Sequence, residues 1–178
     1  MATKIFIDIL LSERCHISPN KYLKTFFDKL KNHLDTKIYF FGSVQRDDYF
    51  PTGSDIDLAI FTDNIKSTIF KLQSFLHKDY NDFKKFVWRL KNDNSLVKGY
   101  KIMYKEPEHN LAVEISVYDE KYKEYILQEH NGKRVLPFYV TYALIIIKYL
   151  FYSLNIMPKE WYIYFKQIIL TKDDYVTL

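Results

Sequence analysis

The sequence has little cysteine, glycine or proline, and each shortage excludes a class of protein. Its single cysteine, Cys15, cannot form an internal disulfide, so secreted disulfide-stapled proteins and cysteine-based metal sites are excluded. Only 4 glycines and 5 prolines occur in 178 residues, which excludes collagen-like and low-complexity chains. The chain instead has 16 tyrosines and 14 phenylalanines, enough for a packed core. We therefore expect a globular protein of a reducing, intracellular compartment.

Two frequent catalytic patterns are missing as well. The five histidines show no His-x-x-x-His spacing, so zinc chemistry and a histidine general base have no support. No Gly-x-x-x-x-Gly-Lys-Ser/Thr loop occurs, which excludes the P-loop NTPases. The charge balance is weakly positive, with 26 Lys+Arg against 22 Asp+Glu and a net charge of +4. This excess is compatible with contact to a polyanion but does not require it.

One stretch, residues 135–157, is nearly uncharged and long enough to span a bilayer. Lys148 lies at its middle, however, where a charge costs about 2.5–3.5 kcal/mol on insertion. Pro137 and Asn155 shorten the usable helix further. We therefore expect a helix buried on most sides of a small protein, and no membrane partner.

Hydrophobic periodicity predicts the order of the elements. Ser18-Pro19 is a suitable start for a helix ending near Asp35, and Asn64 is a suitable cap for a helix that begins at Ile65. Alternating or apolar runs predict strands over residues 37–41, 55–61, 83–90, 96–105 and 111–118. Helical patterns follow Asp119, with a break at 131–132, then over residues 138–154 and 159–170. The order predicts an α+β fold, a mixed sheet covered mainly on one side and followed by a helical C-terminal part.

Two aspartates on the second strand carry the first chemical signal. Residues two apart on a strand point the same way, so Asp55 and Asp57 share one face while Ile56 and Leu58 point to the core. Two neighbouring carboxylates repel each other unless a cation lies between them. Mg²⁺ or Mn²⁺ with oxygen ligands meets that requirement, and two such ions can activate a hydroxyl and stabilise a leaving pyrophosphate.

The second signal is Gly42-Ser43, at the end of the preceding strand. Backbone N–H groups and the Ser43 hydroxyl at such a turn can bind phosphate oxygens, and glycine permits close approach. A triphosphate would then lie between this turn and the metal ions. Either motif alone is weak, but their combination at this spacing, each beside apolar strand residues, is informative.

The run from Phe41 to Arg46, followed by Gly53-Ser54-Asp55-Ile56-Asp57-Leu58, resembles the active-site motif of the DNA polymerase β-like nucleotidyltransferase superfamily. The resemblance implies a mainly antiparallel five-stranded sheet with helices packed on it. It also implies a third carboxylate on a later strand, where Glu114 projects from the polar side of residues 111–118. Asp119 is the alternative ligand, but its place at the strand end favours a helix cap.

The string from Val113 to Ser116 is similar to the third-carboxylate strand of the terminal nucleotidyltransferases, in which aspartate is more usual. The same branch has a helix whose lysine approaches the outer phosphates, and Lys148 matches that lysine. A second lysine often follows four residues later, where this chain has Tyr152. A side chain that merely reaches solvent is the alternative for Lys148.

The resemblance implies a palm-like catalytic domain over residues 1–120 and a helical region packed on it over residues 121–178. It implies a metal-dependent transferase with NTP or dNTP as substrate, an acceptor hydroxyl, most simply on a nucleic acid 3′ end, and pyrophosphate as product. Asp55, Asp57 and Glu114 would be the catalytic and metal-binding residues, and Gly42, Ser43 and Lys148 would bind the nucleotide. A catalytically silent module that binds nucleic acid or a protein is the alternative. Base preference and oligomeric state stay open.

Overall fold

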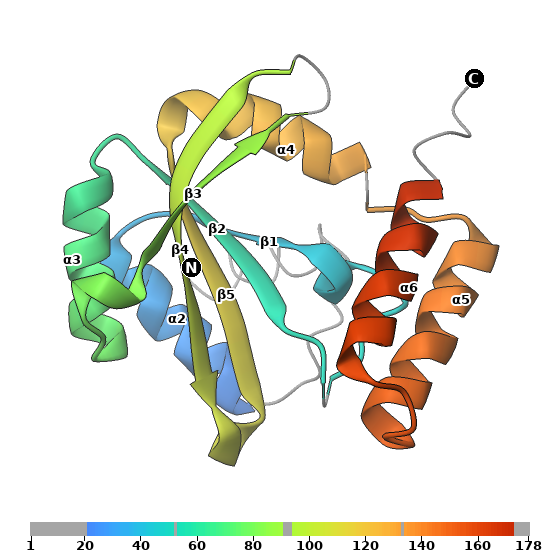
Figure 1. Ribbon diagram of the computed structural model, residues 1–178. Helices are drawn as coiled ribbons and strands as arrows, with labels where there is room; N and C mark the ends of the chain where they lie inside the picture. The colour runs from blue at the N-terminus through green and yellow to red at the C-terminus, as the bar shows by residue number, and fades with distance from the viewer. Residues whose placement is uncertain (1–20, 52, 91–93, 133, 173–178) are drawn as a thin grey trace.

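A computed structural model describes residues 21–51, 53–90, 94–132 and 134–172. Its centre is a five-stranded sheet with strand order β1-β2-β5-β4-β3 (Figure 1). The strands β2 and β5 are parallel, and the other three pairs are antiparallel. The predicted mixed, mainly antiparallel sheet is therefore confirmed. The bounds are β1 Ile38–Phe41, β2 Ile56–Thr62, β3 Lys84–Arg89, β4 Leu96–Glu106 and β5 Leu111–Asp119.

The period of two along the strands decides which side chains enter the core. On β5, buried residues alternate with partly exposed ones from Leu111 to Val117. The same alternation on β2 buries Ile56 and Leu58 and leaves Asp57 on the other face. The predicted apolar and polar sides of β5 are confirmed. On β2, Ile56 and Leu58 point to the core as predicted, but Asp55 lies before the strand, and Ala59 and Phe61 on the side of Asp57 are buried.

Two amphipathic helices cover one face of the sheet (Figure 1): α2, Lys21–Leu34, and α3, Ile65–Leu76. Their buried side chains, Leu30 and Leu72 among them, share one core with the inward residues of β2 and β5. The Asn64 side chain accepts a hydrogen bond from the Ser67 N–H at 3.0 Å, so the predicted cap of α3 is confirmed. The predicted start of α2 at Ser18-Pro19 lies outside the described residues.

The opposite face of the sheet has a smaller core beneath α4, Lys123–Gly132. Ile126 of this helix packs with Phe61 and Tyr118, which lie toward the C-terminal ends of β2 and β5. The sheet is thus covered on this face as well, toward one end of the strands. The polar side chains at the other end of these two strands, Asp57 and Glu114, lie outside this core.

The last helices form a third apolar cluster beside the sheet: α5, Phe138–Lys148, and α6, Lys159–Lys172, lie side by side in Figure 1. A turn of π-helix over Tyr149–Ser153 ends α5, so the α-helix predicted over residues 138–154 is shorter than expected. The expectation that this helix is buried on most sides is wrong. Its outer side is exposed, since only one stripe packs against α6; the exposed residues include Phe138, Tyr142 and Ile146.

Short 3₁₀ turns join several of these elements, over Gly42–Gln45, Tyr80–Asp82, Pro107–His109 and Glu120–Tyr122. The Asp119 carboxylate accepts a hydrogen bond from the Lys121 N–H at 3.1 Å, so Asp119 caps the turn that follows β5, as predicted. Among the described residues, no helix combines the length and the apolar composition needed to cross a membrane.

Candidate active site

The turn after β1 lies directly against the carboxylate of Asp57. Gly42 begins the turn with a φ of +71°, a backbone conformation that favours glycine. A Cβ atom added there would lie 1.9 Å from the Asp57 Oδ2 atom. Both the backbone angle and the available space therefore require glycine at this position. The Gly42-Ser43 turn and the aspartate pair, which begin 13 positions apart in the sequence, are thus in contact in the structure.

Strand pairing places the second and third carboxylates side by side. Asp57 of β2 stands opposite Glu114 of β5 in the parallel register, and Asp55 immediately precedes β2. The pKa of Asp57 is raised to about 6, mainly by burial and next by the negative charge of Glu114. Asp55 adds to the rise, and the positive charges of Lys166 and Arg46 oppose it. Asp57 thus lies in a buried setting in which a neighbouring carboxylate further disfavours its ionised form.

Two hollows meet at Asp57. One, of about 380 Å³, is lined by Gly42, Ser43, Asp55 and Lys148, together with Lys166 of α6. The other, of about 290 Å³, lies on the α4 side and is lined by the following residues among others: Glu114, Ser116, His130 and Arg134. All six residues proposed from the sequence therefore line one or both of these hollows. Asp57 and Gly42 line both.

The donor set suits a hard divalent cation in its chemistry. Three carboxylates supply only oxygen ligands, and the charges of Glu114 and Asp55 both raise the pKa of Asp57. In the described ranges, however, no three His, Cys, Asp or Glu side chains are close enough together to hold a metal ion. The Glu114 Oε2 atom instead pairs with the Lys101 Nζ atom at 3.3 Å. Asp55, Asp57 and Glu114 would thus have to move closer to coordinate a cation.

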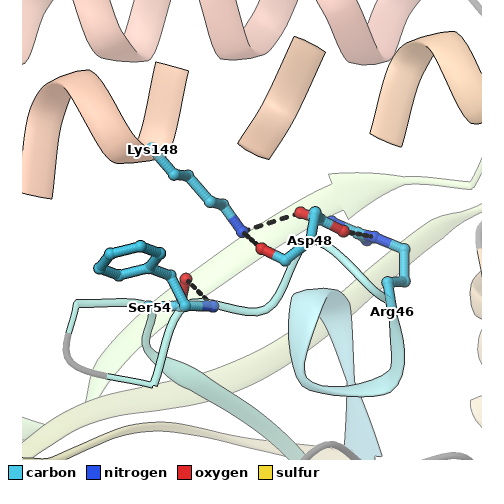
Figure 2. A network of polar contacts seen from close by, with 5 residues as sticks. Arg46, Asp48, Ser54 and Lys148 are labelled. Carbon is cyan, nitrogen blue, oxygen red and sulfur yellow. Dashed lines mark hydrogen bonds and ion pairs between the residues drawn. The ribbon is translucent and has the colours of Figure 1, made fainter. Parts of the chain in front are cut away.

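Lys148 is buried, with 1% of its surface exposed, so the alternative of a solvent-reaching side chain is wrong. Its ammonium donates to the Asp48 backbone oxygen at 2.6 Å and to Asp48 Oδ2 at 2.8 Å. Figure 2 shows Lys148 reaching from its helix to Asp48, with Arg46 on the far side of the carboxylate. Burial lowers the pKa of Lys148, and the charge of Asp48 opposes that effect.

Arg46 completes this buried charge network. Its Nε atom donates to Asp48 Oδ1 at 2.7 Å and a terminal nitrogen donates to Oδ2 at 3.1 Å, a two-point pairing. Burial opposes ionisation of Asp48, but Arg46 and Lys148 outweigh it and hold the pKa of this carboxyl below its usual value. The network joins α5 to the loop that leads from the glycine turn to Asp55.

Tyr152 adds a second attachment between that loop and the helices. Its ring stacks on Phe50 at 5.5 Å, and a Cβ atom at Gly53 would lie 2.3 Å from the ring. Tyr152, at the position where the resemblance leads us to expect a second lysine, thus packs against this loop. Lys166 and Lys159, both on α6, line the same hollow and supply further positive charge.

Sequence reasoning missed Asp48 and Lys166. Asp48 follows Asp47 in a loop without periodicity, and nothing in the sequence distinguishes the buried carboxylate from its exposed neighbour. Lys166 lies on a helix that has no motif. The only available signal was the excess of charged residues in a loop next to Gly42-Ser43.

The chain also matches a known protein family. A nucleotidyltransferase domain matches residues 21–160. The chain belongs to this nucleotidyltransferase family. Among curated proteins, none matches.

Several solved structures are similar to this nucleotidyltransferase. A Cid1 RNA terminal uridylyl transferase is 15% identical, with a TM-score of 0.41 over 78% of this chain and 43% of that chain. The Cid1 poly(U) polymerase with MgGTP bound is 16% identical, with a TM-score of 0.37 over 78% and 44%. A GLD-2/RNP-8 complex is 14% identical, with a TM-score of 0.36 over 90% and 68%. The chain spans less than half the length of these Cid1 chains.

Removing the Asp48 carboxylate should strongly destabilise the protein. Asp48→Ala leaves Arg46 and Lys148 buried without a counter-ion, so we expect the free energy of unfolding to fall by about 3–5 kcal/mol in chemical denaturation. Asp47→Ala is the matched control, because it removes an exposed carboxylate from the adjacent position, and it should cost less than about 1 kcal/mol. Equal losses in the two variants would contradict the role of the buried network.

The raised pKa of Asp57 predicts a pH-dependent stability. The folded state holds the proton up to about pH 6, whereas the unfolded chain loses it near pH 4, so ionisation destabilises the fold as pH rises between these values. In the presence of a chelator, Asp57→Asn should therefore increase the free energy of unfolding by about 1–3 kcal/mol at pH 7.5 and by nothing at pH 3.5.

The control for this experiment is Asp63→Asn, which changes an exposed aspartate just after β2. Its effect on the free energy of unfolding should not follow the pH dependence of Asp57→Asn. The assignment is wrong when the wild-type protein gains stability relative to Asp57→Asn between pH 4 and pH 7.

Proposed function

We propose that this nucleotidyltransferase moves a nucleoside monophosphate from an NTP or dNTP to an acceptor hydroxyl at a nucleic acid 3′ end. The observation that carries the proposal is the contact between the Gly42 turn and Asp57, with Glu114 opposite Asp57 on the adjacent strand. It joins a phosphate-binding turn to a set of carboxylates at one place. Membership of the family supports transfer of a nucleotide.

Asp55, Asp57 and Glu114 would hold two Mg²⁺ or Mn²⁺ ions. When bound, the ions supply neutralisation of the triphosphate charge and activation of the acceptor hydroxyl. Backbone N–H groups of the Gly42 turn and the Ser43 hydroxyl would bind phosphate oxygens. In the reaction, the acceptor oxygen bonds to the α-phosphorus while the bond to the β-phosphate bridge breaks. Pyrophosphate leaves, and the hydroxyl proton passes to Glu114 or water.

The cations of the 380 Å³ hollow would stabilise the outer phosphates. Lys148 contributes from the wall, since its ammonium is held by Asp48 and acts mainly through its charge. Lys166 is less buried and close enough to Asp57 to affect its pKa, so it can approach a phosphate directly. Positioning and charge neutralisation would supply most of the rate enhancement.

Transfer of labelled nucleotides to RNA and DNA primers tests the proposal. With Mg²⁺ or Mn²⁺, the wild-type chain should extend a primer, and Asp55→Ala/Asp57→Ala should lower incorporation by at least about 100-fold, because two of the three carboxylates are lost. Asp63→Ala is the control, since it removes an exposed carboxylate a few residues further along the chain. Each nucleotide is supplied separately, with and without a template strand. Equal incorporation by the double variant would overturn the assignment.

A catalytically silent module that binds nucleic acid is the second candidate. Two proposed functional side chains already have protein partners, Glu114 with Lys101 and Lys148 with Asp48. Calorimetry with an NTP analogue and Mg²⁺ separates the two functions. Triphosphate binding that depends on the metal and on Asp57 supports the enzyme, and its absence from a folded protein supports the silent module.

A further inference from the structure

A line of lysines crosses the sheet from the third carboxylate. Lys101 on β4 lies within an ion-pair distance of 3.3 Å from Glu114 on β5. Lys84 on β3 stands directly opposite Lys101 in the antiparallel register. Directly opposed residues point to the same face of a sheet. Lys101 stands opposite Ser116, which is two positions from Glu114 and therefore on the same face of β5. Asp57, Glu114, Lys101 and Lys84 thus lie on one face of four adjacent strands.

The line ends in a hollow of about 400 Å³ at the edge of the sheet where β3 begins. Lys78, just after α3, joins Lys84 and Lys101 in its lining, and Met103 supplies part of an apolar wall. The acidic residues there are Asp82 and Glu114. The Asp82 carboxylate already accepts a hydrogen bond from the Asp79 N–H at 3.1 Å, which orders the turn before β3. The hollow therefore has more lysines than acids in its lining.

The pairing of Lys84 with Lys101 is unfavourable for the fold alone. Like charges directly opposite each other on adjacent strands destabilise a sheet. Glu114 is placed to offset only Lys101, whose side chain is 43% exposed, and Lys84 and Lys78 are exposed. An anionic ligand lying across the three lysines would remove this repulsion.

We propose that these three lysines, Lys78, Lys84 and Lys101, bind the sugar-phosphate backbone of a single-stranded nucleic acid and lead its 3′ end to Glu114. This inference rests on the proposed function, because it assigns the path of the acceptor at the same site. Several cations around one hollow suit a ligand with repeated phosphates, and flexible lysines bind such a backbone without reading its sequence. A phosphate that pairs with Lys101 also releases the Glu114 carboxylate for the incoming hydroxyl.

Salt-dependent binding of fluorescent single-stranded oligonucleotides, RNA and DNA, tests the path. Anisotropy is measured with the 178-residue chain in a chelator and without nucleotide, so binding is observed apart from catalysis. Lys78→Gln/Lys84→Gln leaves Lys101 and the carboxylates intact. The slope of log affinity against log salt is negative, and each lost phosphate contact makes it less steep by about 0.7. The double variant should therefore make it less steep by about 1.4.

Lys29→Gln/Lys37→Gln is the matched control, with the same change in charge at exposed lysines on and just after α2, the helix on the opposite face. It should leave the slope unchanged, and circular dichroism verifies that both variants are folded. No binding by the wild-type chain, an unaltered slope in Lys78→Gln/Lys84→Gln, or the same loss in the control would each overturn the inference. Primer extension is measured separately. If the chain extends a primer but the slope is unaltered in Lys78→Gln/Lys84→Gln, the proposed function stands and the binding path is wrong. If the chain is inactive but the slope changes as expected, the lysines bind nucleic acid and the proposed function is wrong.

Discussion

The parallel pairing of β2 with β5 is the constraint on which the site depends. It sets Asp57 beside Glu114, and the antiparallel neighbours on either side then place Phe41, just before the glycine turn, and Met103 in the same row. A slip of one residue would move the carboxylates into the apolar core. Burial of Ile56, Leu58, Val113 and Ile115 on the opposite side therefore fixes the position of the chemical groups.

The charge network around Asp48 attaches a helix to the loop of the same site. It connects α5 to the loop between the glycine turn and Asp55, with Lys148 and Arg46 as the two cations. The network leaves one positive charge in excess, next to carboxylates that repel one another. The hollow that we assign to the triphosphate therefore has an excess of positive charge beside it and mutually repelling carboxylates in its lining. Such an arrangement costs stability in the absence of a ligand and favours a ligand that carries both phosphates and cations.

Local patterns were sufficient for the strands, the Asn64 cap and the two faces of β5, because each depends on side-chain period or on a neighbouring residue. Gly42, Asp55, Asp57 and Glu114 could be selected because their motifs and faces are local too. The partner of Lys148 could not be found in this way, since Asp48 lies 100 positions earlier and its burial depends on how α5 packs. The sequence did not predict that one side of α5 is exposed, because a uniformly apolar segment does not indicate which of its faces packs against the protein. The domain boundary near residue 120 stays a prediction.

The sequence by itself determined the order of the elements, the cap of α3 and the two faces of β5. Those properties follow from backbone sterics and side-chain period, which act over a few residues. Only the tertiary structure decided that Lys148 is held by Asp48, that Tyr152 packs over Gly53, and that Lys101 pairs with Glu114. The first two contacts join elements that are distant in the chain, and the third joins two adjacent strands. The energies of all three depend on burial and on neighbouring charges, which exist only once the elements have packed.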